Sequence, residues 1–132
     1  MDDRSESFFP FVHPDLVKVL RAASQSPQPF IVVYGIRTPE AEMQAYISGH
    51  SRTLHSRHLP SKTEKLSCAV DVAAIIDGRV SFAPGKEQEV FGQIFAQIKA
   101  ASEDLRIPVE WGGDWRTLLD YSHIQLPWCN YP

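Results

Sequence analysis

An apolar segment followed at once by Asp-Gly is the feature that most constrains the fold. Residues 69–76, AVDVAAII, are almost all apolar and partly β-branched, which predicts a buried strand. Asp77 and Gly78 form the dipeptide that a two-residue hairpin turn prefers, and residues 79–82 then predict the returning strand. The chain is therefore expected to contain an antiparallel hairpin with a carboxylate, Asp71, inside its apolar strand.

The remaining segments predict helices and further strands around this hairpin. Apolar residues at helical spacing predict helices at 14–23 and 87–101. A third helix is predicted between the start signals Thr38 and Pro39 and the stop signal Gly49. Short strands are predicted at 30–34, 107–111 and 123–126. This order favours an α+β domain in which helices pack on a small, mainly antiparallel sheet. Because the chain contains no repeat or linker, 1–132 is expected to form a single domain.

Charge and composition exclude several classes of protein. The formal net charge is −3, and no stripe of Lys or Arg follows any predicted helix, so nucleic-acid binding is not expected. Residues 1–7 are polar and acidic, unlike a signal peptide, and no apolar run reaches the length of a membrane span. A cytoplasmic origin without membrane contact is expected. Cys68 and Cys129 are then expected as buried thiols, with a link between them as the alternative.

Asp71 is the first residue whose position suggests chemistry. Its neighbours in the strand are Val70, Val72 and several alanines, and burial of an unpartnered carboxylate there costs several kcal/mol. Two interpretations are open. Asp71 lies on the solvent face of a half-exposed strand, or it faces a cation.

Two histidines add the other ligands of a possible metal site. His58 lies in a polar segment before Asp71, and His123 begins the apolar strand near the C-terminus. Two histidines and one carboxylate leave a fourth position for water, which is typical of catalytic rather than structural zinc. Such an ion lowers the pKa of water to about 7 and polarises a carbonyl group.

Asp120 stands three residues before His123. Residues three apart on a straight strand face opposite sides, so Asp120 must lie in the turn before the strand to reach the same site. From there it could exchange a proton with an attacking water and a leaving amine. A turn-capping role is the alternative. Glu110 is a second acidic candidate, either as a base or as a group that orients a metal-bound histidine.

These motifs together resemble a known family. Residues 56–58 (SRH), 69–71 (AVD), 110–115 (EWGGDW) and 120–123 (DYSH) closely resemble the phage endolysin branch of the zinc D-Ala-D-Ala carboxypeptidase and L-alanyl-D-glutamate peptidase family. The resemblance runs from about residue 30 to residue 126 and implies a Hedgehog/DD-peptidase-like fold. The segment between His58 and Asp71 is longer than is usual in the family, and is interpreted as a loop insert around 61–67.

The resemblance also implies a role for each site residue. His58, Asp71 and His123 are the expected zinc ligands, and Asp120 is the expected catalytic base. The serine two residues earlier, Ser56, selects His58 over His55 and is expected to line the cleft. Arg37 matches the family's substrate-positioning arginine, a role that suits a guanidinium at the junction of a strand and a helix. The other candidates are interpreted structurally: His13 and His50 as surface or capping residues, and Trp111 and Trp115 as core packing, with lining of the cleft as the alternative for the two tryptophans.

The expected function is hydrolysis of the amide bond between L-alanine and D-glutamate in peptidoglycan stem peptides, which lyses the bacterial wall. The alternatives are a D-alanyl-D-alanine carboxypeptidase that acts on wall precursors, and a zinc-binding module of the same fold without activity. The resemblance implies a monomer without a separate wall-binding domain. It would be made in the host cytoplasm without a signal peptide and would act on the periplasmic wall after release by a membrane-permeabilising partner.

Overall fold

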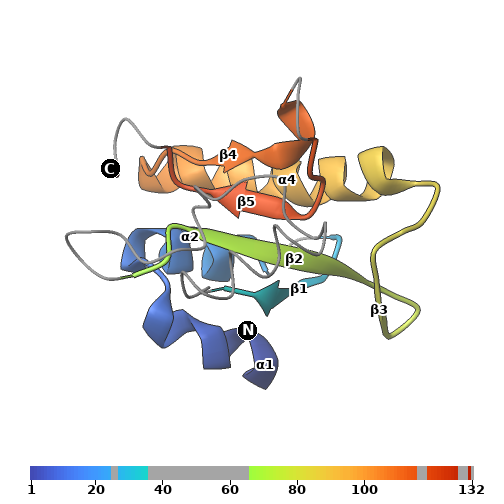
Figure 1. Ribbon diagram of the computed structural model, residues 1–132, viewed down its shortest axis with the longest axis horizontal. Helices are drawn as coiled ribbons and strands as arrows, with labels where there is room; N and C mark the ends of the chain where they lie inside the picture. Colours follow the sequence, from blue (N-terminus) through green and yellow to red (C-terminus); the bar gives the residue numbers. More distant parts are fainter. Residues whose placement is uncertain (25–26, 36–65, 116–118, 128–130, 132) are drawn as a thin grey trace, which may run out of the picture.

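Strand β2 (Ala69–Ile76) is the apolar strand that the sequence predicts at these residues. It lies at the centre of the sheet. A computed structural model of the chain describes residues 1–24, 27–35, 66–115, 119–127 and 131. Within these residues, five strands form one sheet in the order β1-β2-β5-β4, with β3 also paired to β2 (Figure 1). The ladders of this sheet are antiparallel, which confirms the predicted sheet type.

The other strands agree with the sequence pattern, with shorter bounds in places. They are β1 (Phe30–Tyr34), β3 (Arg79–Ser81), β4 (Glu110–Trp111) and β5 (His123–Gln125). Asp77 and Gly78 both have positive φ, 52° and 77°, which is the backbone that the predicted hairpin turn requires. The strand predicted at 107–111 is reduced to its last two residues.

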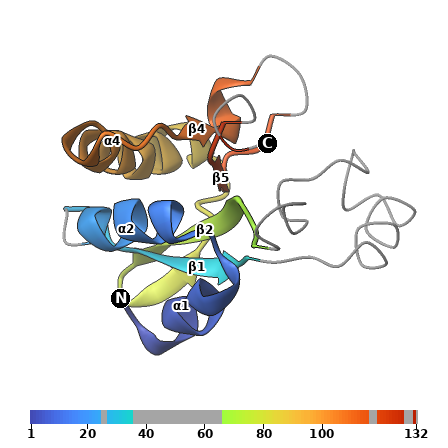
Figure 2. The same ribbon diagram turned by 90° about the vertical axis from the view of Figure 1, so that its left-hand side faces the viewer.

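Helices α2 (Pro14–Ala23) and α4 (Glu87–Leu105) lie on the same side of the sheet (Figure 2). Both have a buried apolar face, with Leu16 and Leu20 on α2 and Ile94 and Ile98 on α4, each almost inaccessible to solvent. These residues pack with the inward-facing side chains of β2 and β5 in one core. The two amphipathic helices predicted from apolar spacing are therefore confirmed, and the α+β class with them.

Helix α4 continues past its predicted end. It extends to Leu105 because Arg106 ends it in the left-handed region, with φ 57°, a conformation that glycine usually supplies. The amide of Ile107 then bonds the carbonyl of Ser102 at 3.0 Å and closes the turn. Arg106 is not the glycine that usually ends a helix, so the stop signal that the sequence carries at this point is Pro108, two residues later.

Helix α1 (Asp3–Phe8) and the 3-10 turn η1 (Phe9–Phe11) are not predicted by the sequence pattern. Helix α1 is short and polar, and lies beside β1 (Figure 1). Its buried Ser5 accepts a hydrogen bond from the backbone N–H of Val32 at 2.8 Å. The Ser5 hydroxyl thus accepts from a backbone N–H that β1, at the edge of the sheet, cannot pair with another strand.

Parts of the predicted architecture lie outside the described residues. The helix expected between Thr38 and Gly49 is one of them, and so is Cys129, whereas Cys68 is buried. The described helices include none that is both long enough and apolar enough to cross a membrane.

Candidate metal centre

Asp71 and His123 are direct partners across the ladder between β2 and β5. Residues that face one another on neighbouring antiparallel strands project from the same side of the sheet. Here Oδ1 of Asp71 lies 3.6 Å from Nδ1 of His123. Asp120 joins them, and one ligand atom from each of the three lies within 4.8 Å of the other two. The structure therefore brings together three of the residues that the sequence selects.

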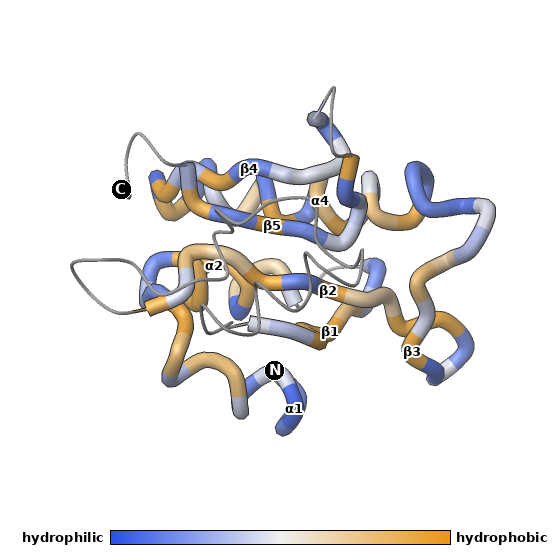
Figure 3. The backbone as a smooth tube through the Cα atoms, in the orientation of Figure 1, coloured by the Kyte–Doolittle hydropathy of each residue, from blue (hydrophilic) through white to orange (hydrophobic). Residues whose placement is uncertain are grey.

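Strand alternation determines which side Asp71 faces. Its neighbours Val70 and Val72 are fully buried in the core, so the side chain of Asp71 points to the opposite side of the sheet. There it is 22% exposed, while that of His123 is 8% exposed. Figure 3 shows β2 as mostly hydrophobic with one hydrophilic stretch, and a hydrophilic stretch on the neighbouring β5. Asp71 thus lies on the side of the sheet opposite the core, next to the imidazole of His123.

Asp120 lies in the turn that enters β5, as its spacing requires. Its backbone N–H donates to the carbonyl of Gly112 at 3.1 Å, and its carbonyl accepts from the N–H of His123 at 3.3 Å. The hydroxyl of Ser122 donates to Oδ1 of Asp120 at 3.2 Å. The carboxylate itself is exposed, so it is open to solvent while these contacts hold the turn near Asp71 and His123.

Two further contacts hold the same turn. The indole N–H of Trp111 donates to the carbonyl of Tyr121 at 2.7 Å, and the N–H of Val72 donates to the carbonyl of Ser122 at 2.9 Å. Trp111 is buried and stacks on Phe95 of α4, with ring centroids 5.4 Å apart. The expected core role of Trp111 is confirmed, and through it the turn is tied to the main helix.

The 3-10 turn η2 (Gly112–Asp114) explains the Gly-Gly pair. A Cβ atom at Gly112 would overlap the carbonyl oxygen of Asp120, and one at Gly113 would overlap the indole of Trp111. Both positions therefore need a residue without a side chain, and the first of them sets how closely Asp120 approaches η2.

The surroundings of His123 change its affinity for a proton. Burial by itself lowers the pKa of the imidazole, but the hydrogen bond and charge of Asp71 outweigh it. Gln125 and the charge of Asp120 act in the same direction, and the pKa is raised above its ordinary value. The surrounding carboxylates thus favour the protonated, positively charged imidazole.

The same groups also offer donor atoms to a divalent cation. Two carboxylates and one imidazole nitrogen are donors that zinc accepts, and the buried Oδ1 of Asp71 faces Nδ1 across a gap that a cation can bridge. A proton or a metal ion would lower the repulsion between these two electron-rich atoms. The donor set of Asp71, Asp120 and His123 therefore fits a metal ion.

Three predicted site residues, Arg37, Ser56 and His58, lie outside the described residues, as does His55. Their assigned roles stay predictions. His13 is described and caps α2: its Nδ1 accepts from the N–H of Asp15 at 3.1 Å, which confirms the capping interpretation.

Two residues near His123, Trp115 and Gln125, are not predicted as site residues from the sequence. Trp115, expected in the core, is half-buried with its ring 5.1 Å from that of His123, so it borders the metal-facing groups. Gln125 was not selected by any motif, yet its Oε1 lies 2.7 Å from Nε2 of His123. Period-two spacing from His123 is the only signal in the sequence that could have indicated it.

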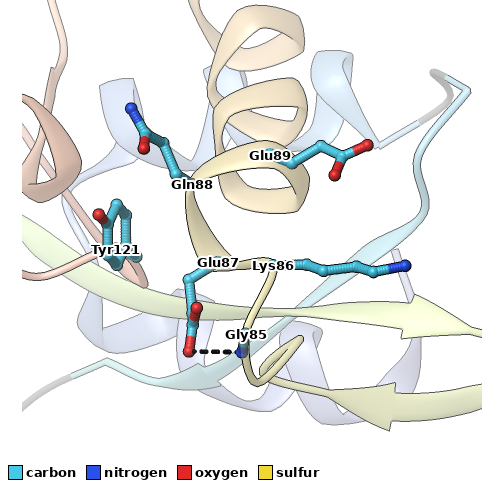
Figure 4. Close-up of a pocket in the computed structure, with 6 residues that line it drawn as sticks. All are labelled: Gly85, Lys86, Glu87, Gln88, Glu89 and Tyr121. Atoms are coloured by element: carbon cyan, nitrogen blue, oxygen red, sulfur yellow. Dashed lines mark hydrogen bonds between the residues drawn. The ribbon is translucent and has the colours of Figure 1, made fainter.

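An open polar pocket lies at the beginning of α4 (Figure 4). Its lining includes Tyr121, which directly follows Asp120 in the chain, but none of the three clustered residues. The carboxylate of Glu87 accepts from the N–H of Gly85 at 3.1 Å within it. The pocket is thus a neighbour of the metal-facing cluster and not the cluster itself.

Comparisons with known proteins show what the chain as a whole is similar to. The phage L-alanyl-D-glutamate peptidase family matches residues 1–126. An L-alanyl-D-glutamate peptidase of Escherichia phage T5 is 32% identical over 119 residues, which cover 89% of this chain and 82% of the relative. A crystal structure of an L-Ala D-Glu endopeptidase of Serratia marcescens superposes with a TM-score of 0.85 at 39% identity, covering 100% of this chain and 92% of that one.

These matches extend over almost the whole chain, including the β2, β4 and β5 segments that carry Asp71, Glu110 and His123. They confirm the resemblance seen in the motifs, and the chain belongs to the phage L-alanyl-D-glutamate peptidase family.

Proposed function

We propose that this family member hydrolyses the amide bond between L-alanine and D-glutamate in peptidoglycan stem peptides, with a zinc ion held by His58, Asp71 and His123. The observation that supports it best is the convergence of Asp71, His123 and Asp120 within 4.8 Å, on a chain of this family. In this proposal the protein acts as a monomer on the periplasmic cell wall after its release from the cytoplasm.

Each residue near the ion has a distinct task. Zinc, when bound, acts as a Lewis acid toward the scissile carbonyl and the attacking water. Asp120 accepts one proton from that water as its oxygen adds to the carbonyl carbon of L-alanine. The same carboxyl group then gives the proton to the nitrogen of D-glutamate as the C–N bond breaks. The products are a free L-alanine carboxylate and a free D-glutamate amine.

The exposure of Asp120 separates it from the two ligands. A base that takes and returns a proton needs access to water and substrate, and Asp120 is exposed, whereas His123 is buried and Asp71 is only partly exposed. Asp120 also belongs to a turn that is fixed at several backbone positions, so its carboxylate has a defined location. Arg37 and Ser56 are proposed to position the substrate.

The test is a digest of purified muropeptides followed by mass analysis. Wild-type protein should create new D-glutamate amino termini, and Asp120→Ala should lower the rate by about 10²–10⁴-fold. Asp120→Ala should still bind one zinc ion, while His123→Ala should lose it. Release of a single D-alanine without a new D-glutamate terminus would identify a carboxypeptidase instead, and undiminished activity of Asp120→Ala would exclude it as the base.

A further inference from the structure

Beyond the metal-facing groups, a row of polar side chains continues across the sheet from His123. Nε2 of His123 lies 2.7 Å from Oε1 of Gln125, and Nε2 of Gln125 donates to Oε2 of Glu110 at 3.2 Å. Gln125 and Glu110 are direct partners in the ladder between β5 and β4. The row thus crosses three neighbouring strands on one side of the sheet, from Asp71 to Glu110.

The row lies largely inside the protein, because His123 and Gln125 are both buried. Gln125 is only 3% exposed, and its partner on β2 is Ala69, whose small side chain leaves room for the amide. A buried amide needs partners for both its oxygen and its nitrogen. His123 and Glu110 are those partners.

The direction of the hydrogen bonds follows from Glu110. Carboxylate oxygens only accept, so the NH₂ group of Gln125 must point to Glu110 and its oxygen to His123. An amide oxygen also only accepts, so Nε2 of a neutral His123 must carry the proton. Nδ1 then has a lone pair, directed toward Asp71.

We propose that Glu110 and Gln125 are positioning residues that hold His123 in its Nε2-protonated form, and so keep Nδ1 ready to bind a divalent cation. This inference deepens the proposed function and rests on His123 as a ligand. Neither residue touches substrate in this proposal. Groups behind a metal-bound histidine typically change metal affinity by about 10–100-fold, because they fix the tautomer and the orientation of the ring.

The two hydrogen bonds that join His123, Gln125 and Glu110 form a relay. In this relay Glu110 has a role different from that of a base. Its carboxylate is engaged with Gln125, and it acts on His123 only through that amide. Asp120, not Glu110, belongs to the cluster with Asp71 and His123 that could hold a metal ion. Of the two roles expected for Glu110 from the sequence, the orienting one is therefore favoured, with Gln125 as the connecting residue.

The test uses variants that break the relay and one that exchanges its amide and its carboxylate. Gln125→Leu removes the acceptor with little change in size, and Glu110→Gln removes the group that fixes the direction of the amide. The double variant Glu110→Gln/Gln125→Glu restores an acceptor for His123 and a donor for that acceptor. Gln93→Leu, on the exposed side of α4, is the matched control.

Two readouts are measured on the intact chain. The first is the ¹⁵N spectrum of His123 in metal-free protein, recorded where the imidazole is neutral, which distinguishes the two tautomers. The second is the dissociation constant for zinc, from competition with a chelator. The first readout does not depend on zinc, so failure of wild-type protein to bind zinc would count against the proposed function and leave the relay to be decided by the spectrum.

Wild type and Gln93→Leu should show one Nε2-protonated form. Gln125→Leu should show a mixture of tautomers and bind zinc about 10–100-fold more weakly. Glu110→Gln should show a smaller change in the same direction, and the double variant should recover most of the affinity. A single Nε2-protonated form and unchanged zinc affinity in both Gln125→Leu and Glu110→Gln would overturn the proposal.

Discussion

The surroundings of Asp71 bear on the two interpretations that its sequence context leaves open. Its side chain projects from the side of β2 opposite the core, where Ala69 and Ala73 are buried and Asp71 is only partly exposed, and it faces His123 across the ladder. The carboxylate does not enter the core, so the cost of a buried charge is not incurred in full. Its partial exposure and its partner together explain why an apolar strand carries an acid at this position.

Removal of Asp71 should affect metal binding far more than folding. Asp71→Asn keeps the size of the side chain but removes its charge, so the affinity for zinc should fall by at least about tenfold. Since the side chain is not part of the core, the free energy of unfolding of the metal-free protein should change by less than about 1 kcal/mol. Chelator competition and urea unfolding measure the two quantities. Unchanged zinc affinity would remove Asp71 from the ligand set.

Asp2 provides a pH-dependent contribution away from the site. Its carboxylate caps α1, accepting from the N–H of Ser5 at 3.2 Å and from its hydroxyl at 2.6 Å. Burial alone raises the pKa of Asp2, but the hydrogen bonds from Ser5 and the backbone outweigh it, and the pKa is lowered. A lowered pKa contributes stability above the unfolded-state pKa, and this is lost as the pH falls through the folded-state value.

The variant Asp2→Asn keeps a capping oxygen but cannot titrate. On lowering the pH from neutral to about pH 3, below the ordinary carboxyl pKa, wild type should lose more stability than this variant. Urea unfolding at both pH values gives the comparison, in which the other carboxyl groups cancel. Equal losses for the two proteins would show that Asp2 does not contribute in this way.

At the scale of elements, the turn between η2 and β5 determines where Asp120 lies. Its position depends on a close backbone approach at Gly112 and on the indole of Trp111, two residues that the sequence separates from Asp120. The EWGGDW motif and the DYSH motif are therefore parts of one structural unit. The Gly-Gly pair is needed for space rather than for a turn conformation.

Gly112→Ala should accordingly displace Asp120. The added Cβ would overlap the carbonyl of Asp120, so we expect lower stability, by about 1–3 kcal/mol, and a large loss of peptidase activity. Gly92→Ala is the matched control, because its Cβ would meet Trp111 only at an ordinary 3.8 Å, and alanine favours the α4 helix. Thermal unfolding and muropeptide digestion would measure both. A fully active Gly112→Ala would refute the close-approach argument.

Helix α4 supplies much of the apolar surface beneath the sheet. Ile98 is fully buried between α4 and the rest of the core, so Ile98→Ala should lower the free energy of unfolding by about 2–5 kcal/mol. Lys99→Ala, at the next and exposed position of the same helix, should change it by less than about 0.5 kcal/mol. Denaturant unfolding of both variants tests the assignment, which similar losses would contradict.

At the scale of the whole molecule, the core and the metal-facing cluster lie on opposite sides of the sheet. The core joins α2, α4 and the inward residues of β2 and β5, and contains none of Asp71, Asp120 and His123. The described fold therefore has its own source of stability apart from any ion. This differs from small zinc domains, whose folding depends on the metal.

Removal of metal should thus leave the protein folded. Far-UV circular dichroism of chelator-treated protein should match that of untreated protein, and zinc at about 100 times its dissociation constant should add about 2.7 kcal/mol of stability. His123→Ala should show no such increase in its melting temperature. Loss of secondary structure on chelation would mean that the ion is needed for the fold.

The sequence alone determined the main elements and indicated the family. Apolar spacing predicted α2, α4, β1 and β2, the Asp-Gly pair predicted the hairpin, and the motifs indicated the family. Each of these depends on residues close together in the chain. The single-domain organisation expected from the sequence stays a prediction.

Only the tertiary structure decided which groups meet. Strand pairing set Asp71 opposite His123, and placed Gln125 between His123 and Glu110. It also brought Gly112 against Asp120, and Trp115 beside His123 instead of into the core. Register and backbone contact between distant segments leave no local pattern in the sequence, because they depend on how the segments pack and not on any one segment's composition.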